Sequence, residues 1–417
     1  MHRMHVLAAT APARRGRSIA IIVLAFAAVA LAAVMFPAAN TSGAPPAGAP
    51  GATPPLRQSF DMQVPAPPTP VTVAGRPKLV YELHLTNFAS APLVLQQVEV
   101  LDARDATVVA VVRDDALDRR MDRPHAPAGT GPRTIAPGMR GVLYFELAVD
   151  DDTLPRILEH RIAFHDVGRQ TQAPAIVRGG RVAVRTGVPI LLGPPLRDGP
   201  WAAVYDPSWK RGHRRVVYTF EGRARIPDRF AIDWVKLDAA GRRARGDEDV
   251  VGNWYGYGAD VLAVADAAVV ATRNDIPESA TLSGRLQYRF EDGAGNHVVL
   301  DLGRDRYAFY KHLKPGSVRV APGERVRRGQ VIGAVGFSGH AGGPQLHFHV
   351  ADADSPLGAA EGLPFALADF DVLGTYDDFD TLGNAPWTPL GDEMAARRTR
   401  ELPAPITVVD FGTNGSQ

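Results

Sequence analysis

Apolar residues alternate with polar or small residues through most of the chain, a pattern that predicts short β-strands. The run KLVYELHLT shows it well, because every second residue is large and apolar: Leu79, Tyr81, Leu83 and Leu85. In an extended chain successive side chains point to opposite faces, so this row predicts a strand with one buried side. Similar runs follow at intervals suited to two packed sheets. We therefore predict a β-sandwich over residues 58–185.

The same alternation continues in residues 195–354, where each run stops at Gly or Pro-Gly and helical periodicity is nearly absent. This pattern predicts short antiparallel strands joined by tight turns. Residues 355–417 mix Pro, Gly and aromatics, which predicts a packing segment and tail, and DEMAARRTREL in that segment is a candidate short helix. The predicted fold class is mainly β: an N-terminal β-sandwich followed by an antiparallel β-sheet domain.

The first residues predict export. Four arginines precede an uncharged apolar run, Ile19–Phe36. Basic residues stay on the cytoplasmic side of a membrane, so residues 1–36 are expected to act as a signal anchor or signal peptide. Residues 37–57, rich in Pro, Ala and Gly, follow as a linker. The rest of the chain is therefore expected outside the cytoplasm, membrane-anchored by this segment or secreted if the segment is cleaved.

Composition narrows the chemistry. The 417 residues carry 46 basic and 45 acidic side chains, a net charge of +1, which gives no sign of a nucleic-acid partner. Cysteine is absent, which excludes disulfides, thiolate nucleophiles and Cys-based metal sites. His, Asp and Glu remain as candidate metal ligands.

The run GGPQLHFHV combines a strand pattern with candidate ligands. Its apolar face holds Leu346, Phe348 and Val350, which explains why a strand forms. The opposite face carries Gln345, His347 and His349. This polar row is either a solvated face or a site.

Three runs in series, YKHL, PGERVRRGQVIGAVGFSG and GPQLHFHV, resemble the lysostaphin or LytM type of zinc endopeptidase, which cuts peptide cross-links in bacterial peptidoglycan. The resemblance implies an antiparallel β-sheet groove over residues 195–354, with one zinc at its floor. It also implies peptidoglycan peptides as the substrate.

Carried over residue by residue, the resemblance makes Asp233 and His347 zinc ligands and His312 the first catalytic histidine. Two positions differ from the family pattern: Arg229 stands where the first zinc histidine is expected, and Gln345 where the second catalytic histidine is expected. Arginine offers only donors and stays charged, so it cannot bind a cation. Glutamine can hydrogen-bond but cannot take a proton at neutral pH.

Two outcomes of these changes stay open. If RFAIDW is a strand, Arg229 shares the groove face with Asp233, and a pair between them would fill a lost metal site. The protein would then be a pseudopeptidase that binds peptidoglycan or regulates a cell-wall hydrolase. Alternatively, the ligand set has shifted: His349 would join His347 and Asp233 around zinc. His213 is another candidate replacement.

A third class of protein, a lipoyl or biotinyl carrier, has less support from the sequence. The run VAPGERVRRGQVIGAVG also resembles the repeat of lipoyl or biotinyl carrier domains. It lacks a lysine at a hairpin tip in the Met-Lys or Asp-Lys context that such a carrier needs. The other two classes, peptidase and pseudopeptidase, can be distinguished by whether the purified protein contains a metal.

Overall fold

The computed structural model describes residues 57–412, except 124–128, 151–152, 170–172, 211 and 392–395. The predicted export element and nearly all of the linker lie outside these residues. Among the described residues, no helix has the length and apolar character to cross a membrane. Strands dominate and the single α-helix of the described part is short, α1 (Asp114–Arg120), so the mainly β prediction is confirmed.

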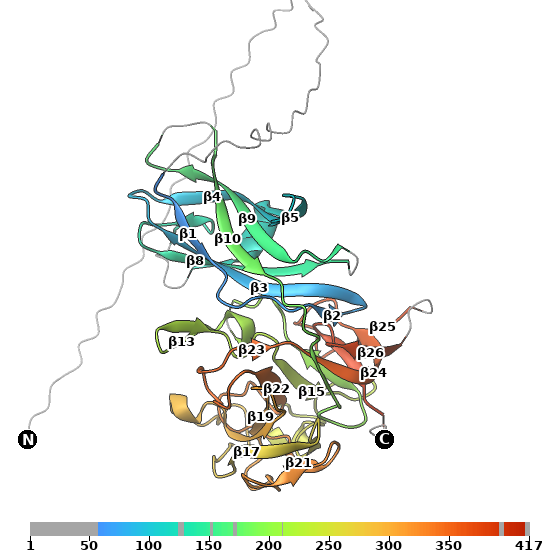
Figure 1. The fold of residues 1–417 in the computed structure, drawn as a ribbon. Helices are drawn as coiled ribbons and strands as arrows, with labels where there is room; N and C mark the ends of the chain where they lie inside the picture. Colours follow the sequence, from blue (N-terminus) through green and yellow to red (C-terminus); the bar gives the residue numbers. More distant parts are fainter. Residues whose placement is uncertain are drawn as a thin grey trace, which may run out of the picture. The chain divides into compact units, whose positions relative to one another are not determined.

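The N-terminal part forms two antiparallel sheets with a shared core (Figure 1). The first contains β1 (Phe60–Gln63), β3 (Arg76–Asn87), β8 (Arg140–Ala148) and β6 (Met121–Asp122), with β2 (Val71–Val73) paired to β3. The second contains β10 (Ala175–Ala183), β9 (Ile157–Asp166), β4 (Leu93–Asp102) and β5 (Val108–Arg113), with β7 (Thr134–Ile135) paired to β4. The apolar row predicted on β3 is fully buried between them.

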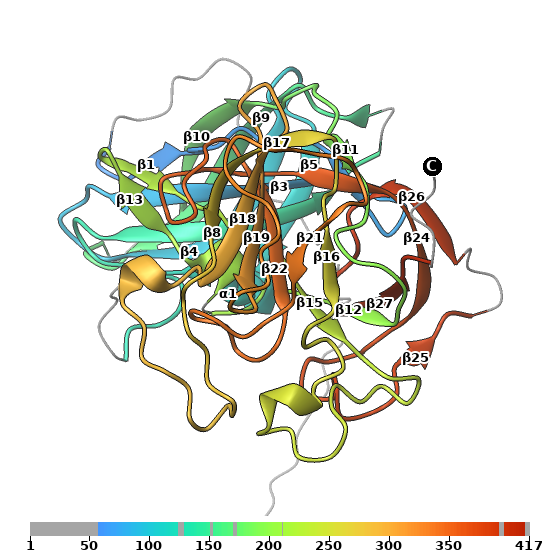
Figure 2. The ribbon, with the colours of Figure 1, turned by 90° about the horizontal axis from the view of Figure 1, so that it is seen from below.

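The C-terminal part is built on one large sheet. Its central order is β12 (Trp201–Val204), β15 (Ile232–Lys236), β22 (Leu346–Ala351), β19 (Tyr307–Leu313), β18 (Asn296–Asp301), β17 (Ala267–Arg273) and β20 (Arg325–Val326). All these neighbours pair antiparallel, and β17, β18, β19 and β22 run side by side in Figure 2. Two small two-stranded sheets accompany it: β13 (Tyr218–Phe220) with β14 (Arg223–Arg225), and β16 (Asp260–Leu262) with β21 (Val331–Ala334).

Residues beyond the predicted groove domain extend this sheet. On the far side of β12 it continues through β27 (Thr407–Asp410) and β24 (Phe365–Thr375) to β11 (Ile190–Leu192), which pairs parallel to β24. Three short strands pair with members of this sheet: β23 (Gly362–Leu363) with β22, and both β25 (Thr388–Pro389) and β26 (Arg397–Glu401) with β24. The predicted short helix is wrong in its described part, because β26 pairs with β24. Pairing to a ready sheet edge outweighs the helix propensity of its arginines.

One face of the large sheet is apolar and the other carries the polar row. Ile232, Trp234, Tyr310, Leu346 and Phe348 lie together in the main core. Their neighbours along the strands must therefore point to the opposite face. This alternation places the polar side chains of β15, β19 and β22 together over the sheet.

The two parts of the chain pack together within one compact unit that spans Pro55–Gln417. Val71 and Val73 of β2 belong to the core of the large sheet, and Val73 forms a parallel bridge with Leu402. The segment between β1 and β3 therefore contributes to both cores.

A candidate metal centre

The polar face of the large sheet carries a row of facing side chains. Asp233 of β15 lies opposite His347 of β22, and His347 lies opposite Lys311 of β19. Directly opposite residues on neighbouring strands have Cβ atoms only about 5 Å apart. The sheet register alone thus brings an acid, a histidine and a lysine together.

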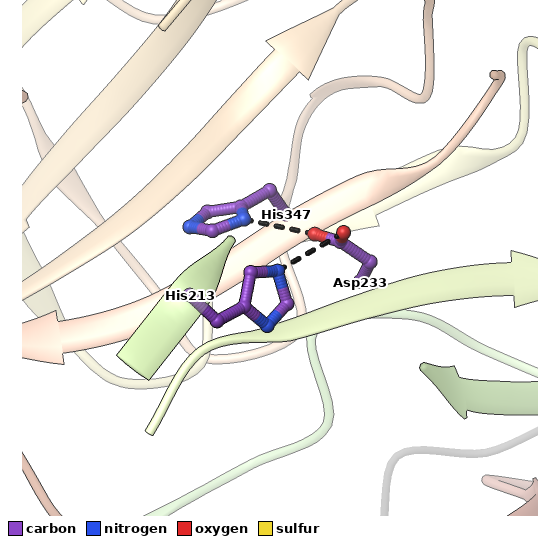
Figure 3. A group of neighbouring side chains, drawn as sticks. All are labelled: His213, Asp233 and His347. Carbon is purple, nitrogen blue, oxygen red and sulfur yellow. Dashed lines mark hydrogen bonds and ion pairs between the residues drawn. The ribbon is translucent and has the colours of Figure 1, made fainter. Parts of the chain in front are cut away.

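A second histidine reaches this row from outside the sheet. His213 begins the 3₁₀ turn His213–Arg215. One oxygen of the Asp233 carboxylate accepts a hydrogen bond from Nε2 of His213 at 3.1 Å, and the other accepts one from Nδ1 of His347 at 2.8 Å. Figure 3 shows both rings pointing to the carboxylate. Two imidazole nitrogens and a carboxylate therefore converge at one point.

Charge is concentrated here. Burial raises the pKa of Asp233, but His213 and His347 outweigh burial and hold this pKa well below its usual range. Burial likewise lowers the pKa of His347, but Asp228 and Asp233 outweigh it, so the pKa is raised overall. Each ring nitrogen of His347 thus lies within hydrogen-bond distance of a different carboxylate, Nδ1 beside Asp233 and Nε2 beside Asp228.

The far nitrogen of His347 meets a different group. Its Nε2 lies 3.1 Å from Oδ1 of Asp228 and 3.2 Å from Nδ1 of His349. The His349 ring is stacked on Phe309 with a centroid distance of 4.6 Å, and Nζ of Lys311 lies 3.4 Å from Oδ1 of Asp228. Asp228 therefore accepts from His347 and is already paired with a cation.

The structure divides the predicted ligand set of Asp233, His347 and His349 between two groups. One consists of His213, Asp233 and His347, and the other of Asp228, His347 and His349. The strand spacing explains the split: Asp233 is opposite His347, so His349 lies two residues further along β22, beside the other nitrogen of the His347 ring. His347 and His349 therefore share one face of β22, but only His347 lies beside Asp233.

The first group fits a zinc ion better. Two nitrogens and one oxygen beside a solvent-reachable cavity match the open three-ligand arrangement of catalytic zinc sites. The second group contains His349, only 1% exposed, and the ammonium of Lys311 would oppose a further cation at Asp228. Asp228 instead fits the role of the carboxylate that orients a metal-binding histidine through its other nitrogen.

Of the two open outcomes, the pair between Arg229 and Asp233 is not formed: Arg229 has other partners. Arg229 precedes β15, in a turn, so strand alternation does not place it on the groove face. Its guanidinium donates to Oε2 of Glu82 from Nε at 2.9 Å and from Nη2 at 2.7 Å, and it also pairs with Glu361. The arginine at the expected zinc-histidine position is thus directed to the β-sandwich, away from the candidate metal centre.

His312 and Gln345 line the same cavity as the metal group, a space of about 460 Å³. His312 has a left-handed backbone (φ 64°), which is unusual for a residue with a Cβ and typical of functional sites. Its Nδ1–H donates to the carbonyl of Ser338 at 2.9 Å. Burial lowers the pKa of His312 to about 3, so the ring is neutral and its Nε2 carries a lone pair.

Sequence reasoning named His213 but missed Asp228 and Glu82. Asp228 directly precedes Arg229 in a turn and belongs to no alternating pattern. Glu82 falls on the polar face of β3, which alternation alone would expose to solvent, yet it is 2% exposed. No local signal identifies either residue, because both act through contacts distant in the sequence.

Part of the chain that carries the candidate site matches a known protein family. Residues 255–358 match the family described as Peptidase family M23. The matched part includes His312, Gln345 and His347. His213 and Asp233 precede it and lie outside the match. The resemblance to lysostaphin or LytM-type M23 peptidases is thus confirmed over a quarter of the chain.

The relatives are similar over limited parts. The peptidoglycan DD-endopeptidase ShyA of Vibrio cholerae is 32% identical over 110 residues, which cover 26% of this chain and 21% of that protein. The chain thus spans about a fifth of the length of this relative. The catalytic domain of lysostaphin from Staphylococcus simulans is 22% identical, with 30% of this chain and 84% of that chain covered and a TM-score of 0.19. A zinc containing peptidase from Vibrio cholerae is 13% identical, with coverage of 71% and 83% and a TM-score of 0.21.

Proposed function

We propose that this protein is a zinc metalloendopeptidase that hydrolyses peptide bonds in peptidoglycan, with His213, Asp233 and His347 as its metal ligands. The observation that supports this most directly is the convergence of two histidine nitrogens on the Asp233 carboxylate. The M23 match and the similarity to a peptidoglycan endopeptidase favour this substrate. His213 would replace the ligand lost at Arg229.

Bound zinc would supply a water of lowered pKa and polarise the substrate carbonyl. Asp228 accepts a hydrogen bond at Nε2 of His347 and so keeps Nδ1 directed to Asp233. The lone pair on Nε2 of His312 can accept a hydrogen bond from a water in the cavity and so orient that water. The amide of Gln345, on the wall of that cavity, can donate a hydrogen bond to a developing oxyanion without proton transfer.

The site lies in a setting that suits a peptide strand. The cavity is walled by aromatic side chains, among them Trp209, Tyr218, Phe290 and Phe379. Phe290 and Phe379 are exposed. Rigid aromatic walls favour binding of an extended chain, because they lose little conformational freedom.

The alternative is a pseudopeptidase that binds peptidoglycan, or regulates a cell-wall hydrolase, in the same groove. It is favoured by one observation: Gln345 occupies the position of a catalytic histidine and cannot take a proton. Under this alternative the contacts of His347 with Asp228 and Asp233 would be the permanent state of the site.

Metal analysis of the purified full chain tests the proposal. We expect about one zinc per chain, and digestion of purified peptidoglycan that stops on chelation and returns on addition of zinc. Stoichiometric zinc without digestion would favour a binding groove that has kept its metal. No zinc and no digestion would favour the pseudopeptidase and overturn the proposal.

We further propose an extracytoplasmic location, because peptidoglycan lies outside the cytoplasmic membrane and residues 1–36 read as an export element. Protease added to intact cells should then degrade the part beyond about Pro37. Full protection of that part would contradict the proposed location.

A further inference from the structure

One buried carboxylate of the β-sandwich contacts both segments that carry the candidate metal centre. Oε1 of Glu82 accepts a hydrogen bond from Nε of Arg214 at 2.6 Å. Oε2 of the same residue accepts from Arg229 at 2.9 and 2.7 Å. Arg214 directly follows His213, and Arg229 directly follows Asp228. Glu82 thus binds the residue next to His213, a candidate ligand, and the residue next to Asp228, which contacts the candidate ligand His347.

Arg214 is attached to the sandwich at three points. Besides Glu82, its Nη2 donates to the backbone carbonyl of Tyr81 and to that of Phe145, each at 2.7 Å. These two carbonyls belong to neighbouring strands, β3 and β8. A planar guanidinium with this many acceptors has little freedom to move. Since Arg214 is 5% exposed, these contacts are also shielded from water.

His213 depends on this attachment because only one of its two ring nitrogens, Nε2, is hydrogen-bonded among the described residues. Among the described residues its Nδ1 has no hydrogen-bond partner, whereas metal-binding histidines usually donate their second N–H to an acceptor. Its backbone is left-handed (φ 43°), a conformation that a residue with a Cβ keeps only when its surroundings impose it. On its other sides the ring packs edge-on against Trp209, with a centroid distance of 5.6 Å, and against His347, with a centroid distance of 5.2 Å.

We infer that Glu82 is a positioning residue of the metal centre: through Arg214 and Arg229 it fixes His213 and Asp228 around Asp233 and His347. The inference rests on the proposed function for its link to zinc. It makes the β-sandwich an integral part of the site. It also accounts for the arginine at position 229, which binds the sandwich where the resemblance expects a ligand.

The test compares Glu82→Gln with Asp102→Asn in the full chain. Glutamine keeps the size of Glu82 but removes the charge shared by the two arginines. Asp102 is a matched control, because it is also a buried carboxylate of the sandwich (6% exposed) paired with an arginine, Arg104, far from His213 in the sequence. Zinc affinity is measured by competition with a chromogenic chelator, and ligand geometry by the absorption bands of the Co²⁺-loaded protein.

We expect Glu82→Gln to weaken zinc binding by at least about tenfold, the lower end of the effect of outer-shell partners, and to shift the Co²⁺ bands. Asp102→Asn should bind zinc as the unaltered protein does, even if its unfolding temperature falls. Equal zinc affinity and equal Co²⁺ spectra in the two variants would overturn the inference.

A metal-free readout separates this inference from the proposed function. Because Trp209 packs on His213, its indole N–H signal in NMR reports the position of that turn without zinc. The signal should move in Glu82→Gln and stay in Asp102→Asn, and the absence of any shift would overturn the inference even if the protein binds zinc. If the unaltered protein binds no zinc, the proposed function fails while the Trp209 signal still decides the positioning role. Should Glu82→Gln not fold, Arg214→Lys serves, since a lysine cannot reach all three acceptors.

Discussion

Asp233 and His347 face each other across β15 and β22, and Nδ1 of the histidine lies 2.8 Å from the carboxylate. This pair is fixed by the strand register, whereas the third candidate ligand, His213, comes from a turn that the sandwich holds. The candidate metal centre therefore combines a rigid sheet with a segment that is attached to a distant carboxylate.

Removal of His213 should abolish stoichiometric zinc binding. His213→Ala takes one of only two nitrogens from the ligand group, so we expect a loss of affinity greater than the ~10–100-fold typical of outer-shell changes. His340→Ala is the control, because His340 lines the same cavity without belonging to a ligand group of the described residues. Metal analysis after dialysis checks the outcome. If His349→Ala removes zinc and His213→Ala does not, the ligands are Asp233, His347 and His349 instead.

Restoring the family histidine at position 229 should destabilise the protein without raising its zinc affinity. Arg229→His leaves Glu82 with one partner and Glu361 without its arginine. Breaking such a buried ion pair costs about 3–5 kcal/mol, measured by urea unfolding. Arg104→His is the control, since Arg104 is exposed and water screens its pair with Asp102, so the loss of this pair should destabilise the protein far less. Unchanged stability together with tighter zinc binding would contradict the assignment of Arg229.

Glu82 should make the stability of the protein depend on pH in acid. Burial alone would raise the pKa of Glu82, but Arg229 and Arg214 lower it from 4.5 to about 2. A carboxyl with a lowered folded-state pKa stabilises the protein above its unfolded pKa, and that contribution is lost as the pH falls toward the folded value. The window therefore runs from about pH 4.5 down to about pH 2, with a total of roughly 3 kcal/mol.

The measurement is the free energy of unfolding at several pH values. The difference between the unaltered protein and Glu82→Gln should shrink through this window. Glu146→Gln is the control, because Glu146 pairs with Lys78 and contacts neither arginine of this network. If the difference in the free energy of unfolding stays constant with pH, the negative charge of Glu82 does not stabilise the protein through the two arginines.

Loss of His312 should separate catalysis from metal binding. His312→Ala removes the neutral imidazole whose Nε2 can hydrogen-bond and orient a water in the cavity, so hydrolysis should fall by about 10²-fold. Zinc content should stay unchanged, because His312 belongs to neither ligand group of the described residues. Product release from labelled peptidoglycan gives the rate. A variant that loses zinc as well would place His312 among the ligands.

Gln345→Met should lower the rate of hydrolysis with little change in the KM for peptidoglycan fragments. Methionine keeps the approximate size of glutamine but has no N–H to donate to an oxyanion, and the loss of such a donor costs about 10²–10³ in kcat. Full activity in Gln345→Met would exclude this role. A rise in KM alone would indicate that Gln345 binds the substrate in its ground state.

Alternation along the chain was enough to predict the strands. The apolar rows of β3 and β22 are fully buried as expected, because a period of two leaves an extended chain only one way to hide its large side chains. The same argument failed for Arg229, which precedes β15, and for β26, where sheet pairing prevails over helix propensity. Local patterns are least informative at the ends of elements.

The sequence by itself determined the mainly β class, the polar row of β22 and the resemblance that names Asp233, His347 and His312. Only the tertiary structure decided that His213 meets Asp233, that His349 lies behind His347, and that Arg229 is directed to Glu82. The physical reason is that strand periodicity fixes the face of a side chain, whereas partners come from register and from the packing of distant segments. Glu82 and His213 are 131 residues apart in the numbering of the chain, and only the fold brings Arg214 between them.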